Sequence, residues 1–173
     1  YGLYFFEDPI EPENMDAWEY VAHRLPMPVA MGERLYTIYQ FRDLLNRNAA
    51  AYVRPDLSLA GGITNCKKIA AIAEASYVGV VPHNPLSCVL TAACVQLDAA
   101  THNIPIQEYP RDEYEKPKVD LVKEPLKREG GYLLVSDTPG IGIELNEEAF
   151  KHYPPVSRQR PPLIAPDGSL RDY

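Results

Sequence analysis

The sequence predicts an α/β fold: the C-terminal part of a (β/α)8 barrel of the TIM type, with about five βα units, followed by a C-terminal extension. Short apolar segments rich in β-branched residues alternate along the chain with segments whose apolar residues have helical spacing. The polar residues that close the apolar segments fall at positions 7, 33, 56, 83 and 108, at intervals of 26, 23, 27 and 25 residues. Eight such units make a barrel of about 250 residues, so five units form only part of one.

A doubly wound parallel sheet is the alternative architecture. Such a sheet carries a glycine-rich phosphate loop, GxGxxG, near the point where its strand order reverses. The pair Gly61-Gly62 does not have this pattern and indicates a turn between a strand and a helix. The regular interval between strand ends therefore favours the barrel.

The expected strands are short and mostly apolar. They cover residues 3–6, 29–31, 51–53, 77–81 and 104–107. Helices are expected between them, at residues 14–25, after Thr37, after Thr64 and at about 87–100. Thr37 and Thr64 are the residues expected to cap the second and third helices, because a threonine hydroxyl can accept a hydrogen bond from a free backbone N–H of the first turn.

The character of the chain changes after Tyr109, and we divide it into a partial barrel at residues 1–109, holding strands four to eight, and an extension at residues 110–173. Residues 111–127 are rich in charge and proline and are expected to be extended. Short strands are expected at 132–135 and around the turn at 138–143, and a brief helix is expected from Asn146 to Phe150. The proline-rich residues 153–173 are expected to form an extended tail. The extension would pack against the barrel and against a capping domain outside this chain.

Composition excludes several classes of protein. The net charge is −7 and no basic cluster occurs, so binding to nucleic acid or to an anionic membrane has no support. No apolar run approaches the roughly 18 residues of a membrane span, and no signal-peptide pattern is present. Cys66, Cys88 and Cys94 lie in apolar helical surroundings, which indicates buried thiols in a reducing compartment, and we expect a cytoplasmic protein. The chain begins inside an apparent strand without an initiator methionine, so we expect a fragment.

His83 lies between Pro82 and Pro85, just beyond the apolar run that ends at Val81. Histidine is the commonest general base in enzymes, and barrel enzymes carry their catalytic residues at the carboxyl ends of strands. Asp56, at the preceding strand end, could orient the imidazole; it could equally cap the turn before Gly61.

Glu7 and Glu33 close neighbouring strands and could supply oxygen ligands for Mg²⁺, or they could be solvated carboxylates at the rim. Glu108, at the last strand end, could hydrogen-bond a substrate oxyanion in its protonated form or make a structural salt bridge. Arg34 and Arg54 lie next to strand ends, as counter-ions or as parts of the barrel wall. His23, His102 and His152 lack a carboxylate partner in the expected arrangement and are expected at the surface.

These strand ends resemble those of the mandelate racemase branch of the enolase superfamily, and most of all its acid-sugar dehydratases of the galactonate type. The motifs that carry the resemblance are Phe6-Glu7-Asp8-Pro9, Gly32-Glu33-Arg34, Arg54-Pro55-Asp56 with the following residues to Thr64, Pro82-His83-Asn84-Pro85 and Gln107-Glu108. The order and spacing of these motifs are specific for the branch and less specific for the substrate. The resemblance extends from Tyr1 to about Ile143.

The resemblance implies a lyase that uses Mg²⁺ to dehydrate a small sugar acid to a 2-keto-3-deoxy acid. It implies that Glu7 and Glu33 bind the metal, that His83 paired with Asp56 removes the α-proton, and that Glu108 hydrogen-bonds the enediolate. A further metal ligand and a second acid/base would lie upstream of this chain, and the complete protein is expected to be a homo-oligomer. Two alternatives stay open: a racemase or epimerase of the same superfamily, and a catalytically inert fragment.

Overall fold

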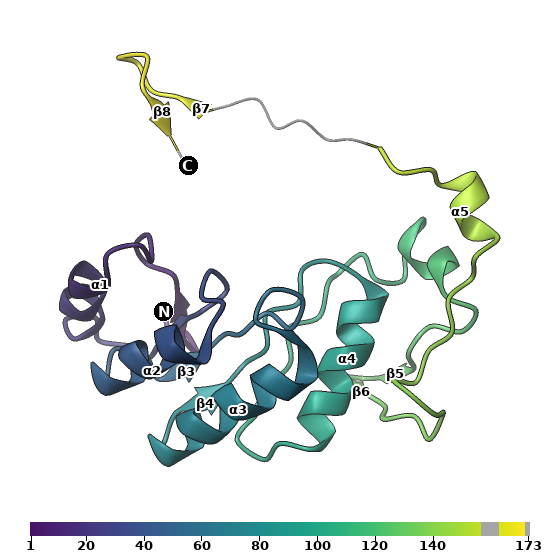
Figure 1. The fold of residues 1–173 in the computed structure, drawn as a ribbon, viewed down its shortest axis with the longest axis horizontal. Coiled ribbons are helices and arrows are strands. Elements are labelled where there is room, and N and C mark those ends of the chain that lie inside the picture. The colour runs from purple at the N-terminus through teal and green to yellow at the C-terminus, as the bar shows by residue number, and fades with distance from the viewer. Residues whose placement is uncertain (157–162, 172–173) are drawn as a thin grey trace.

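The computed structural model describes residues 1–156 and 163–171. Four parallel strands form one sheet in the order β1-β2-β3-β4, with a helix following each strand (Figure 1). The strands are β1 (Phe6–Glu7), β2 (Val29–Met31), β3 (Tyr52–Val53) and β4 (Gly79–Val80). The helices are α1 (Met15–Ala22), α2 (Ile38–Asn46), α3 (Gly62–Ala75) and α4 (Cys88–Ala99). The predicted βα repeat is present, and its four strands form an open parallel sheet.

The register of the sheet aligns the strand ends. Phe6 pairs with Val29, and Val53 pairs with Val80, so the chain leaves each strand at a similar level. An isolated parallel bridge between Asp56 and His83 continues the pairing of β3 and β4 beyond their last regular residues. Parallel strands direct all their carboxyl ends to one edge, and that edge receives every strand-end side chain.

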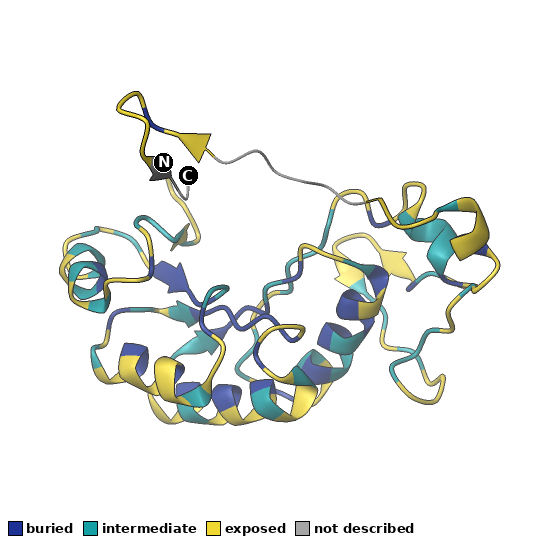
Figure 2. Ribbon diagram, turned by 45° about the horizontal axis from the view of Figure 1, so that its top comes forward, coloured by how far each residue is buried: buried dark blue, intermediate teal, exposed yellow. Residues whose placement is uncertain are grey.

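The core lies between the sheet and its helices. The buried faces of α2, α3 and α4 turn toward the strands while their outer faces are exposed (Figure 2). Trp18, Phe41, Leu44, Ile69 and Leu97 are fully buried in one apolar cluster. The Trp18 indole N–H donates to the Ala49 carbonyl, 3.0 Å away, which ties α1 to the loop after α2.

Helix capping agrees with the sequence at Thr37, differs at Thr64, and adds a cap at Ser87 that was not predicted. Thr37 forms a capping box with Gln40, and Ser87 accepts a hydrogen bond from the Leu90 N–H at the start of α4. The predicted cap at Thr64 is wrong, because α3 already begins at Gly62 after Gly61 in the left-handed region. Glycine takes this conformation without the steric penalty of a Cβ atom, and it replaces a side-chain cap here.

The predicted strand at 104–107 does not form. The Asn103 carbonyl accepts a hydrogen bond from the Val80 N–H at 2.9 Å, which places this segment beside β4, but no regular strand follows. Pro105 has no N–H to donate, so it removes a ladder hydrogen bond from the middle of the segment. The described barrel portion therefore has four strands rather than five.

The extension contains more regular structure than the sequence indicates. The expected strand at 132–135 is β6 (Tyr132–Leu133), which pairs with β5 (Arg128–Glu129) in an antiparallel hairpin, whereas 138–143 forms no strand. A 3-10 helix, η1, covers Lys118–Leu121. The expected helix starts later, as α5 (Ala149–His152), and Asn146 instead donates to the Asp120 carbonyl. Within the expected tail, β7 (Leu163–Ile164) and β8 (Leu170–Arg171) form a hairpin, while residues 157–162 and 172–173 lie outside the described part.

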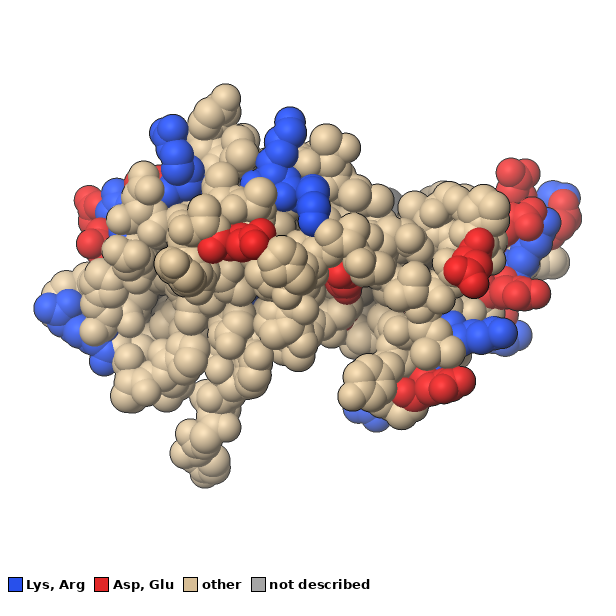
Figure 3. Space-filling model, turned by 90° about the horizontal axis from the view of Figure 1, so that it is seen from below, with Lys and Arg blue, Asp and Glu red and all other residues tan. Residues whose placement is uncertain are grey.

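The three cysteines are buried free thiols, as predicted. Burial raises the pKa of the Cys66 thiol to about 12. His102 differs from the prediction, since its Nε2 lies 2.6 Å from Glu74 Oε1, although its side chain is 80% exposed. In the described ranges, no helix has the length and apolar content that crossing a membrane requires. Basic and acidic side chains are interspersed on the face seen in Figure 3, without a basic stripe.

Candidate active site

The carboxyl edge of the sheet brings the five predicted site residues into one connected group. Glu7 ends β1, while Glu33, Asp56 and His83 follow β2, β3 and β4 by two or three residues. Glu108 comes from the segment beside β4. Arg54 pairs with Glu7 and Glu108, and His83 contacts Glu33 and Asp56. The two sets meet where the carboxylates of Glu7 and Glu33 lie within 4.8 Å of each other.

His83 lies between two carboxylates. Its Nδ1 is 3.0 Å from Asp56 Oδ2, and its Nε2 is 3.1 Å from Glu33 Oε2. A carboxylate on Nδ1 accepts the N–H of that nitrogen, which fixes the ring orientation and leaves Nε2 as the atom that can take a proton. The arrangement is that of a general base with an orienting carboxylate.

Asp56 is buried, with a side chain that is 1% exposed. Its Oδ1 accepts hydrogen bonds from the Ser58 N–H at 2.7 Å and the Ser58 hydroxyl at 2.5 Å, and its Oδ2 faces the imidazole. A buried carboxylate needs such partners because burial removes its hydration. Asp56 is thus held by its own turn and directed at His83. It both caps the turn and orients the histidine, so the two interpretations that the sequence left open are both correct.

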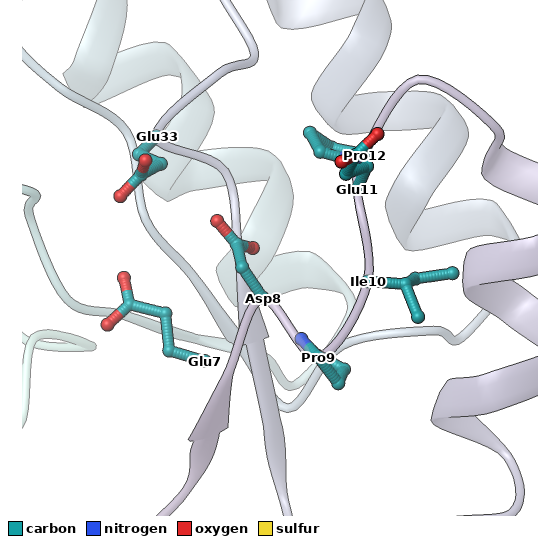
Figure 4. A pocket seen from close by; sticks show the side chains of 7 residues that line it. All are labelled: Glu7, Asp8, Pro9, Ile10, Glu11, Pro12 and Glu33. Carbon is teal, nitrogen blue, oxygen red and sulfur yellow. The ribbon is translucent and has the colours of Figure 1, made fainter. Parts of the chain in front are cut away.

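Glu7, Asp8 and Glu33 form an acidic cluster. One carboxylate oxygen from each lies within 4.8 Å of the others. Figure 4 shows the three carboxylates pointing toward a common space beside a cavity of about 440 Å³ that Pro9, Ile10 and Pro12 also line. Three oxygen donors at this spacing suit a hard divalent cation.

Burial and mutual repulsion raise the pKa of two members of this acidic cluster. Burial is the largest cause for Glu7, and Glu108 and Glu33 add to it while Arg54 opposes it. The pKa of Asp8 is raised to about 7, by burial first and then by Glu33 and Glu7. Asp8 Oδ1 is buried and has no hydrogen-bond partner among the described residues. Three carboxylates that repel one another, one of which has a buried oxygen without a hydrogen-bond donor, suit a metal ion.

Arg54 lies between Glu7 and Glu108. Its side chain is 4% exposed; Nη2 donates to Glu108 Oε2 at 2.5 Å, and Nε makes an ion pair with Glu7 Oε1. Glu108 Oε2 also accepts the Asn84 backbone N–H at 2.8 Å. Arg54 is therefore a counter-ion of the site, whereas Arg34 pairs with Glu13 at the periphery.

Two residues of the site have roles that the sequence reasoning missed. Asp8 directly follows Glu7, and alternation along an extended strand would direct it to the other face. Its φ of +37° turns the chain and brings its carboxylate beside that of Glu33. The Glu-Asp-Pro sequence is the only signal that could have indicated such a turn. Asn84 is fully buried and contacts both Glu108 and Thr91, which the sequence did not reveal.

Comparison with known proteins agrees with this geometry. Residues 1–149 match the family model described as enolase C-terminal domain-like. D-galactonate dehydratase of Variovorax paradoxus is 35% identical over 98% of this chain and 46% of its own length, and that of Cronobacter sakazakii is 37% identical over 86% and 40%. The chain thus spans a little under half of the length of these relatives.

Solved structures give the same assignment. An enolase of Agrobacterium radiobacter with bound Na and L-malate matches with a TM-score of 0.85 and 36% identity over 96% of this chain and 45% of that one. A mandelate racemase/muconate lactonizing enzyme-like protein of Rubrobacter xylanophilus matches with a TM-score of 0.80 and 38% identity, over 87% and 39%. The chain belongs to the enolase superfamily, as part of the C-terminal domain of the mandelate racemase/muconate lactonizing enzyme group.

Proposed function

We propose that the complete protein carrying this chain is a Mg²⁺-dependent dehydratase that converts a sugar acid, a galactonate-like aldonate, to a 2-keto-3-deoxy acid. The observation that carries the proposal is the His83 imidazole, oriented by Asp56 and adjoining the acidic cluster through Glu33. The relatives named D-galactonate dehydratase support this substrate class. L-malate bound to the Agrobacterium relative supports a hydroxy acid.

Glu7 and Glu33, together with Asp8, are the residues that would hold the metal within this chain. Their oxygens suit Mg²⁺, and the unpaired Asp8 Oδ1 is an available ligand atom. The bound ion would supply positive charge where the substrate carboxylate gains negative charge.

The side chains of this chain then divide the reaction between them. His83 Nε2 takes the proton from the carbon α to the substrate carboxylate, and Asp56 stabilises the imidazolium that forms. The electron pair of the broken C–H bond passes toward the carboxylate, giving an enediolate to which Glu108 hydrogen-bonds. The pair then forms the α–β double bond as the β-hydroxyl takes a proton from an acid supplied by the rest of the complete protein and departs as water. The resulting enol tautomerises to the 2-keto-3-deoxy acid.

We also propose that residues 1–109 supply these strand ends, and that residues 110–173 pack against the barrel and a capping domain. The functional test is incubation of the complete protein with galactonate and Mg²⁺, followed by semicarbazide detection of a 2-keto acid. Product that disappears on His83→Asn supports the proposal. Exchange of the α-proton without any keto acid would instead identify a racemase or epimerase.

A further inference from the structure

Arg54 is a buried charge at the centre of the strand-end group. A guanidinium that is 96% removed from solvent is tolerated only where carboxylates and hydrogen bonds replace its hydration. Arg54 has carboxylates on two sides, Glu7 and Glu108, and its Cζ lies 6.0 Å from the centre of the Phe5 ring. Its contacts therefore come from two segments that are about a hundred residues apart in the sequence.

The backbone fixes where this side chain begins. The Arg54 N–H donates to the Met31 carbonyl at 2.8 Å. Gly32, which has a φ of +145°, lies so close that a Cβ atom there would be 2.9 Å from the Arg54 nitrogen. The end of β2 thus packs directly on Arg54, so the guanidinium is aimed by the sheet rather than by a flexible loop.

The two carboxylates are held with different rigidity. Glu108 Oε2 accepts both the Arg54 Nη2–H and the Asn84 N–H, and the Asn84 side-chain amide donates to the Glu108 carbonyl at 3.0 Å. Glu7 and Glu108 are about equally exposed, at 35% and 33%, but Arg54 Nε lies beside Glu7 without the alignment of a hydrogen bond to any described residue. The contact to Glu108 is therefore specific in direction, and the contact to Glu7 is chiefly electrostatic.

We propose that Arg54 is a positioning residue that holds Glu108 in place for the substrate and competes with the divalent cation for Glu7. This inference rests on the proposed function, in which Glu7 binds the metal and Glu108 meets the substrate carboxylate. The planar guanidinium can contact two carboxylates at once, which a lysine ammonium at the same position does less well. Its positive charge beside the acidic cluster also opposes that of a cation bound there.

The first test is Mg²⁺ titration by calorimetry of the complete protein and its variants. Arg54→Gln removes the competing charge and is expected to tighten Mg²⁺ binding about tenfold. Arg54→Lys keeps the charge and should stay within about twofold of the unmodified protein. Arg47→Gln is the matched control, because Arg47 also contacts three carboxylates, Asp16, Glu19 and Asp43, but lies away from the strand ends.

The second test needs neither metal nor substrate, so its outcome is separate from that of the proposed function. The Asn84 amide reports on Glu108 because its N–H donates to the same oxygen as Arg54. In ¹H–¹⁵N spectra, the Asn84 resonance should move in both Arg54→Gln and Arg54→Lys and stay in place in Arg47→Gln. The Lys variant keeps this measurement available where the Gln variant fails to fold.

Unchanged or weaker Mg²⁺ binding by folded Arg54→Gln would overturn the competition with the cation. An Asn84 resonance that stays in place in Arg54→Lys would overturn the positioning of Glu108. If neither the unmodified protein nor its variants bind Mg²⁺, the metal site assigned to Glu7 is wrong, and so is the competition of Arg54 with the cation. The Asn84 resonance still tests whether Arg54 positions Glu108.

Discussion

Replacement of Asp56 by asparagine isolates the pairing of the catalytic imidazole. The variant keeps the size of the side chain, and an amide oxygen can still accept from the Ser58 N–H, now 2.7 Å from Oδ1. The amide NH₂ cannot accept the Nδ1–H of His83, which lies 3.0 Å from Oδ2. The change therefore removes the hydrogen bond that orients the base and the charge that stabilises the imidazolium.

The expected magnitude follows from the type of bond. A hydrogen bond to a charged group contributes about 1.5–3 kcal/mol, and each 1.4 kcal/mol corresponds to about a tenfold change in rate. Loss of the orienting bond alone should lower kcat/KM for dehydration by about 10- to 150-fold. A larger loss is expected where asparagine also holds the imidazole in the wrong tautomer.

The assay is semicarbazide detection of keto acid with the complete protein, alongside a Ser58→Ala control. Ser58→Ala removes the 2.5 Å hydroxyl contact to the same carboxylate but leaves the contact between Asp56 and His83 in place. We expect Ser58→Ala to retain most of the activity. Equal kcat/KM for Asp56→Asn and the unmodified protein would refute the assignment of Asp56 as the partner of the base.

Three further predictions concern stability and the isolated chain. Burial raises the pKa of Asp98 from 3.8 to about 7, so folding favours its protonated form and stability falls as pH rises between these values. The shift corresponds to at most about 4 kcal/mol, and this figure is reduced because Asp98 is only partly buried. In urea unfolding, we expect Asp98→Asn to raise the free energy of unfolding by about 2 kcal/mol at pH 8 and hardly at pH 4. Equal effects at both pH values would contradict this. Phe41→Ala should lower that free energy by about 4 kcal/mol, since Phe41 is fully buried, and a loss below about 1 kcal/mol would show that the apolar cluster is loosely packed. The isolated 173-residue chain should bind Mg²⁺ weakly and form no detectable keto acid from galactonate, so turnover by this chain alone would disprove the need for further protein.

The sequence predicted the parallel sheet and the identity of the strand-end residues well, because both depend on local patterns. A buried strand ends where its apolar run ends, and Glu7, Glu33, Asp56 and His83 lie within three residues of those ends. Thr37 could be recognised as a cap because its partner Gln40 lies only three residues away. Strand ends and helix caps can therefore be predicted without knowing which distant residues come into contact.

The features that the sequence did not reveal depend on long-range packing. Residues 104–107 have the apolar composition of a strand, but Pro105 breaks the ladder. The joint contact of Arg54 with Glu7 and Glu108 links segments that only the folded sheet brings together. The position of Asp8 depends on a backbone turn with positive φ, which its residue type allows but does not require.

The central claim is that His83 removes the proton α to the substrate carboxylate. The most direct measurement is ¹H NMR of galactonate in D₂O with the complete protein and Mg²⁺, comparing the unmodified enzyme with His83→Asn. We expect that the unmodified enzyme removes the α-proton signal of galactonate, and that the variant does not remove it but still binds Mg²⁺ in calorimetry. Loss of the α-proton signal at an unchanged rate in His83→Asn would contradict the assignment of His83 as the base.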